Sequence, residues 1–110
     1  MTDKETEEKI GQLQLLEQNL QAFLVQKQQF QTQEIEVDSA LSEIKDKKDA
    51  YKIIGNLMIK VNTTQLTDEL SQKKESLSIR IKNLEKQEEK VREKLKTIQT
   101  EVLKKIKHLN

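Results

Sequence analysis

Residues 51–61 read YKIIGNLMIKV, and this stretch differs from the polar, helix-patterned sequence on both sides of it. Two short runs rich in aliphatic residues flank a Gly55-Asn56 pair, which predicts a β-hairpin with a two-residue turn. Glycine at the first central position suits a type II′ turn, because that position needs a positive φ. A two-stranded hairpin is only marginally stable in water. This one is too apolar to remain exposed, so we expect it to pack against something else.

The composition gives little material for a globular core. Of 110 residues, 34% are hydrophobic and 35% charged, and the aromatic residues are two Phe and one Tyr. Such a composition is typical of long helices and coiled coils, and the absence of proline leaves both flanks free to stay helical. We predict a mostly α fold in one domain, residues 1–110: a helix over about 5–50, a hairpin over about 51–62 and a second helix over about 64–109.

Several classes of function find no support in the residues. The chain has no cysteine, which excludes disulfides and thiol chemistry, and its one histidine is His108 near the end. No glycine-rich phosphate loop and no set of His, Asp and Glu with metal-ligand spacing is present. We therefore expect no enzyme, no catalytic residues, no cofactor and no metal. No signal-peptide pattern and no apolar run of about 18 residues occurs, which predicts a cytoplasmic protein without a membrane span.

The first predicted helix carries an uninterrupted heptad pattern. Nine of its twelve a and d positions are apolar or aromatic, which favours a coiled coil. These positions are Leu13, Leu16, Leu20, Phe23, Lys27, Phe30, Glu34, Val37, Leu41, Ile44, Lys48 and Tyr51. Asp3 or Thr2 can cap the beginning of this helix.

The second predicted helix repeats the pattern, again with nine apolar positions of twelve. Asn62 or Thr64 can cap its beginning, and Gln65 stands three residues after Asn62 as in a capping box. The a and d positions are Leu70, Lys74, Leu77, Ile81, Leu84, Glu88, Val91, Leu95, Ile98, Val102, Lys105 and Leu109.

A short connection between two long helices makes them antiparallel neighbours. At 1.5 Å per residue, each helix of roughly 40 residues is ~60 Å long. One register that pairs a with d places Leu16 near Val102, Leu20 near Ile98, Phe23 near Leu95 and Val37 near Ile81. Lys27 and Glu88 then lie in adjacent layers. We expect them to form an ion pair; the alternative is that both side chains extend to water.

The free ends of the two helices hold apolar residues that a two-helix seam does not bury. Leu15, Leu103 and Ile106 are off the a and d positions, so apolar surface should be open there, and such surface usually marks a binding site. The alternative is a broadened seam in a frayed end.

Charge is unevenly distributed along the chain. Residues 1–50 hold 11 acidic and 6 basic side chains (net −5), and residues 66–110 hold 8 and 12 (net +4). Opposite signs favour side-by-side helices. A nucleic-acid surface is disfavoured, because the basic residues of the second half alternate with acidic ones and stacking aromatics are missing.

The hairpin between two heptad segments carries a family resemblance. AYKIIGNLMIKV (residues 50–61) resembles the hairpin of prefoldin β-type subunits (the GimC family), and LTDELSQKKESLSIRIKNLEKQEEK (66–90) resembles the start of their second helix. The similarity extends from about residue 10 to 107. A single hairpin favours the β type over the two-hairpin α type. The lack of cysteine and the short tails favour an archaeal member.

The resemblance implies an assembly and a function. It implies a hexamer of four β-type and two α-type chains, in which hairpins join into an intersubunit β-barrel. The residues expected in that assembly are Ile53, Ile54, Leu57, Met58, Ile59 and Val61. It also implies ATP-independent holding of non-native client proteins at the coiled-coil tips and their delivery to a group II chaperonin. The expected client contacts are Ile10, Leu13, Leu16, Leu103, Ile106 and Leu109.

Further expectations concern partners. The acidic residues Asp3, Glu5, Glu7 and Glu8 are expected to meet a basic chaperonin surface. Two other functions stay open: a structural coiled-coil adaptor or tether without chaperone activity, and a nucleic-acid-binding helical hairpin, against which the interleaved charges argue. Membrane partners are not expected.

Overall fold

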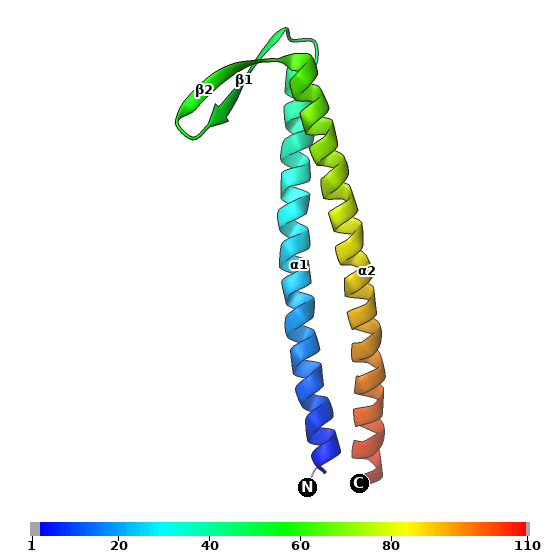
Figure 1. The fold of residues 1–110 in the computed structure, drawn as a ribbon. Helices are drawn as coiled ribbons and strands as arrows, with labels where there is room; N and C mark the ends of the chain where they lie inside the picture. The colour runs from blue at the N-terminus through cyan, green and yellow to red at the C-terminus, as the bar shows by residue number, and fades with distance from the viewer. Residues whose placement is uncertain (1–2, 110) are drawn as a thin grey trace. The chain divides into compact units, whose positions relative to one another are not determined.

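The computed structural model describes residues 3–109, with side chains described over residues 3–107 (Figure 1). The order of elements is α1 (Lys4–Ile44), β1 (Asp49–Ile54), β2 (Leu57–Asn62) and α2 (Thr63–Leu109). The fold is therefore mostly α, with two long helices joined by a single β-hairpin, as predicted. None of the helices in the described part is long and apolar enough to cross a membrane.

The chain divides into two compact units. The first combines residues 1–28 with residues 83–110, and the second is residues 29–82. In the first unit the start of α1 runs antiparallel to the end of α2, since Lys9 contacts Glu101 and Lys27 contacts Glu88. In the second unit Asp38 of α1 contacts Lys74 of α2, close to the hairpin in sequence. That the whole chain forms one domain stays a prediction.

The hairpin has the predicted turn. β1 and β2 pair antiparallel from Asp49↔Asn62 to Ile54↔Leu57, which leaves Gly55 and Asn56 as the two-residue loop. Gly55 has φ +59°, and Asp46 is the only non-glycine residue with a positive φ in the described part of the chain. A positive φ at the first central residue alone is the type II′ pattern, which suits the twist of the two strands.

The first helix ends earlier than predicted. It stops at Ile44, not near residue 50, and the hairpin begins at Asp49. Asp46 adopts φ 67°, and the backbone N–H of Lys47 donates a hydrogen bond to the Ile44 carbonyl at 3.1 Å. Aspartate tolerates this left-handed conformation, which commonly ends a helix. Lys48 therefore lies outside the helix, and Tyr51 lies in β1, so neither occupies a seam position.

Side-chain caps begin both helices as expected. Asp3 Oδ1 accepts a hydrogen bond from the Thr6 N–H at 2.7 Å, and Asn62 Oδ1 accepts one from the Thr64 N–H at 2.8 Å. Each satisfies a backbone donor that the first turn leaves without an intrahelical partner. Thr2, the other predicted cap of α1, lies outside the described residues.

Burial follows the heptads. The buried apolar residues of the helices all lie at predicted a and d positions: Val37, Leu77, Ile81, Leu84, Leu95 and Val102. On α1 the seam positions from Leu13 to Ile44 are otherwise half-buried, and on α2 Lys74 is the seam position that stays exposed. The apolar stripe that the sequence predicts is therefore the stripe that packs.

The register of the seam differs from the predicted one by about one heptad. The predicted pairing would place Glu101 opposite Glu17, about 12 Å along the axis from Lys9. Instead Lys9 Nζ contacts Glu101 Oε2 at 3.1 Å, and Asp38 Oδ1 contacts Lys74 Nζ at 2.7 Å. A slip of seven residues pairs a with d equally well, so the heptads alone do not distinguish the two registers. The contacts of Lys9 with Glu101 and of Asp38 with Lys74 identify the shifted one.

Candidate functional site: the hairpin and the distal helix ends

The hairpin is a two-sided apolar surface. Alternate residues of a strand point to opposite faces. One face carries the Ile54↔Leu57 pair and the other carries Ile53↔Met58. In the chain by itself these four side chains are 54–70% exposed. Aliphatic side chains this open on both faces of a two-stranded ribbon leave it with no core of its own.

The base of the hairpin is tied to its own unit. Ala50 is buried, and its cross-strand partner Val61 is half-buried. Lys52 Nζ contacts Glu69 Oε2 of α2 at 3.2 Å, and Thr63 Oγ1 donates a hydrogen bond to the Lys48 carbonyl. Figure 1 shows the rest of the ribbon projecting away from the paired helices of this unit. Of the six predicted assembly residues, only Val61 is partly covered; the other five are exposed.

We define the distal end as residues 3–16, at the start of α1, and residues 98–107 of α2, both in the first unit. Three apolar side chains are open here off the seam, as predicted: Leu15 is 58%, Leu103 61% and Ile106 40% exposed. Ile10 is also open, at 37%. Leu13 and Leu16 are half-buried in the seam. The side chain of Leu109 lies outside the described ones.

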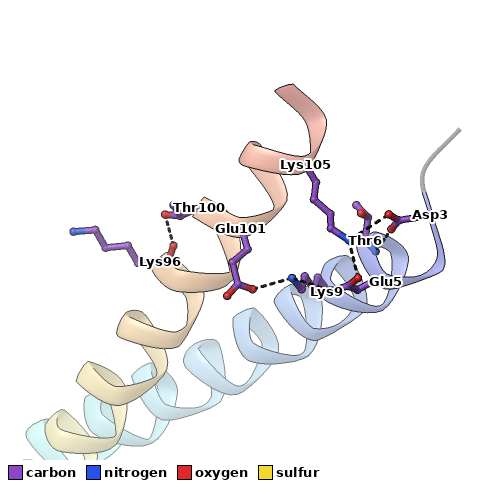
Figure 2. A network of polar contacts seen from close by, with 8 residues as sticks. All are labelled: Asp3, Glu5, Thr6, Lys9, Lys96, Thr100, Glu101 and Lys105. Carbon is purple, nitrogen blue, oxygen red and sulfur yellow. Dashed lines mark hydrogen bonds and ion pairs between the residues drawn. The ribbon is translucent and has the colours of Figure 1, made fainter. Parts of the chain in front are cut away.

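Charged residues join the two helices at the distal end. We call Asp3, Glu5, Lys9, Glu101 and Lys105 the ionic cluster (Figure 2). Lys105 Nζ lies 2.8 Å from Glu5 Oε2 and 3.2 Å from Asp3 Oδ2. Lys9 Nζ lies 3.1 Å from Glu101 Oε2 and 3.5 Å from Glu5 Oε1. The five charges thus form one connected network across the helix pair.

The electrostatics of the cluster favour its charged forms. The Thr6 backbone N–H, followed by the Thr6 side chain and Lys105, lowers the pKa of Asp3 from 3.8 to about 2. The hydrogen bond from Lys105 lowers the pKa of Glu5 and is matched by a raised pKa of Lys105. Glu101 likewise raises the pKa of Lys9. All these groups reach solvent, so each pair by itself contributes little to stability.

Sequence reasoning missed this cluster, although a signal was present. Continuing the heptads backward from Leu13 gives Lys9 and Thr6 as seam positions, and Thr6 is indeed fully buried. Asp3 and Glu5, which we expected to face a chaperonin, instead pair with Lys105 of their own chain. Their expected role outside the chain stays a prediction.

A second polar contact interrupts the seam. Lys27 Nζ contacts Glu88 Oε2 at 3.1 Å, with the two side chains only 22% and 15% exposed, so the expected ion pair forms. Arg92 Nη2 holds the other oxygen of Glu88 at 3.0 Å. The hydrogen bond from Arg92, and then that from Lys27, lowers the pKa of Glu88. The carboxylate is therefore shared between its own helix and the partner helix.

The described residues hold no group of three His, Cys, Asp or Glu side chains that could bind a metal ion. Several open apolar side chains lie together on the hairpin and at the distal end, and charged residues lie beside each of these surfaces. Such surfaces suit protein–protein contact.

Comparison with known proteins agrees with this arrangement. The model of a family described as "Prefoldin subunit" matches residues 7–108. The chain is 40% identical over 88 residues to a prefoldin subunit beta of Archaeoglobus fulgidus, covering 77% of this chain and 76% of that one. It is 38% identical over 92 residues to that of Thermococcus onnurineus, covering 81% and 79%.

A solved structure shows the same fold. The crystal structure of the prefoldin beta subunit from Thermococcus strain KS-1 superposes with a TM-score of 0.83 at 35% identity, covering 91% of this chain and 90% of that one. The paired helices, the single hairpin and the match along nearly the whole sequence lead to one conclusion. The chain belongs to the prefoldin family, as a chaperone subunit of the β type.

Proposed function

We propose that the chain is part of an ATP-independent holdase that binds non-native proteins at the distal ends of its helices and delivers them to a group II chaperonin in the cytoplasm. The observation that carries this proposal is the open apolar surface at the distal end, in a chain of the prefoldin family. Non-native clients expose apolar side chains. Several such ends in one assembly give many weak contacts, so binding is strong overall while each contact releases readily.

Assembly follows from the hairpin. We propose a hexamer of four β-type copies and two α-type chains, in which the hairpin surface becomes buried in an intersubunit β-barrel. Its five exposed aliphatic side chains support this, since full burial of each contributes about 1.5–3 kcal/mol. Pairing with further strands also satisfies the open strand edges, which otherwise invite aggregation.

The test replaces the open residues of the distal end. Leu103→Ser with Ile106→Ser should weaken suppression of aggregation of a chemically unfolded enzyme while the assembly keeps its native mass. Ile79→Ser is the control, because Ile79 is an open isoleucine on the same helix, 54% exposed, outside the distal end. If the Leu103/Ile106 variant suppressed aggregation as well as the parent protein does, the distal end would be excluded as the client-binding surface.

Native mass spectrometry of the complex recovered from cell extract separates this proposal from the adaptor alternative. Four copies of this chain with two larger chains support the holdase assembly. A dimer, or a complex with one unrelated partner, supports a structural tether.

A further inference from the structure

The seam changes character at the distal end. Through most of the two helices its inner positions are apolar, ending at Leu13 on α1 and Val102 on α2. Beyond them the inner positions are Thr6, Lys9 and Lys105. Among the side chains that the structure describes, apolar burial in the seam therefore ends at Leu13 and Val102, and the ionic cluster joins the layers beyond them (Figure 2).

Such a joint is weak and depends on salt. Glu5, Asp3 and Glu101 are each about half exposed or more at their side chains, so water competes for every pair. Exposed ion pairs contribute little and are screened by ions. The ion pairs therefore add only modestly to the closed arrangement of these last layers, and a partner that binds the separated arrangement better shifts the population towards it.

The seam positions next to the ionic cluster are apolar and covered. Val102 is only 7% exposed, and Leu13 and Ile98 are half-buried. Next to them along the helices are side chains that are open already: Ile10, Leu103 and Ile106. Separation of the last layers would join the covered residues to the open ones in a single larger apolar surface. Larger contiguous apolar surface binds apolar segments more strongly.

We propose that the ionic cluster is a clasp over a covered extension of the client-binding surface, formed by Leu13, Ile98 and Val102, which opens to take apolar segments of a non-native chain. The inference rests on the proposed holding function. It adds Ile98 and Val102 to the client contacts and limits the contact made by Leu13 to the open state. A client binds the covered extension in the open state and not in the closed one. The clasp therefore sets the fraction of distal ends whose covered extension is able to bind a client.

A cross-link tests the clasp within the full assembly. Because the chain has no cysteine, Lys9→Cys with Glu101→Cys introduces one thiol pair where the two side chains meet. A short bis-maleimide closes the distal end, and N-ethylmaleimide on the same variant leaves it open. The matched control places the pair at Asp38→Cys and Lys74→Cys, which also meet across the helices but in the other unit.

We expect the closed form to bind an unfolded enzyme at least about twofold more weakly than the open form. The loss should be proportional to the fraction of distal ends that the cross-link keeps closed. The control pair should hold equally with either reagent. Equal holding by the closed and open forms at the distal end would overturn the clasp, while the Leu103/Ile106 variants still judge the holding function separately. An assembly that holds no client at all would overturn both.

A second measurement follows opening without any client. Nitroxide labels at Gln12→Cys and Gln99→Cys, both exposed positions, report the separation of the two helices. We expect the distance to lengthen towards 1 M salt, where the screening length is about 3 Å. Lys105→Gln should lengthen it already at low salt, whereas Lys74→Gln should not. A label-to-label distance that changes neither with salt nor in the Lys105→Gln variant would overturn the clasp.

Discussion

Single residues decide how polar groups are tolerated in this seam. Lys27 and Glu88 form an ion pair, and both side chains are half-buried. Arg92 contacts the second oxygen of the same carboxylate. A carboxylate with two cationic partners tolerates partial burial, because both of its oxygens keep charge-assisted hydrogen bonds. The two cations differ in role, since Arg92 is on the same helix as Glu88 and only Lys27 joins the helices.

Charge reversal at this pair should show the coupling. Lys27→Glu and Glu88→Lys should each destabilise the chain, and the double variant should recover part of the loss, with a coupling free energy of about 0.5–1 kcal/mol. Recovery is incomplete because the new lysine lies beside Arg92. Urea unfolding of the four proteins measures the coupling. Combining the double reversal with Arg92→Gln should recover more; additive losses in the original cycle would contradict the pair.

Asp3 acts as both a cap and a charge. Its folded-state pKa of about 2 lies below the ordinary 3.8, so its stabilising contribution is complete above about pH 4 and is lost as the pH falls towards 2. Carboxyl NMR titration of the full chain should find this low pKa. Lys105→Gln should raise the pKa only part of the way, because the Thr6 N–H is the larger cause. A return to 3.8 in that variant would contradict this order of causes.

At the scale of elements, replacing each of the two glycines with alanine should change the stability of the chain in opposite directions. Gly55 has φ +59° in the hairpin turn, and Gly11 lies within α1; neither would bring a Cβ within 4 Å of another group. Backbone preference alone therefore decides the effect. Gly55→Ala should destabilise by about 1–2 kcal/mol through the left-handed conformation. Gly11→Ala should stabilise by about 0.5–1 kcal/mol through helix propensity.

Free energies of unfolding in urea measure both changes. Gly55→Asn serves as a control, because asparagine visits the left-handed region more readily than alanine and should cost less. Equal costs for alanine and asparagine at position 55 would show that the turn adopts another conformation.

For the whole molecule, the two apolar faces of the hairpin should both matter to assembly. Ile54 and Met58 point to opposite faces, so Ile54→Asp and Met58→Asp each place a charge on one of them. Each alone should weaken the assembly, and together they should abolish it, since a buried unpaired carboxylate is strongly unfavourable. Native mass and sedimentation measure the result.

The control for this experiment is Ile35→Asp. Ile35 is 66% exposed on α1 and outside the hairpin, so the assembly should survive its replacement. An intact assembly with both hairpin aspartates present would exclude the hairpin as the joining surface.

Local sequence patterns predict much of this fold. The heptads identify the buried apolar side chains of the two helices, and Gly55-Asn56 identifies the turn, because both signals depend on neighbours a few residues away. The same applies to the caps at Asp3 and Asn62. The sequence also predicts that the hairpin side chains and Leu103 are exposed, since two helices and two strands cannot cover them.

The register and the ionic cluster depended on the folded chain. A seven-residue slip leaves the apolar pairing intact, so the seam pattern is equally satisfied by either alignment. The observed alignment is seen in the contacts between the helices, Lys9 with Glu101 and Asp38 with Lys74. That alignment brings Lys105 beside Asp3 and Glu5, about 100 residues apart in sequence. Contacts between residues so distant arise only once the helices have found their register.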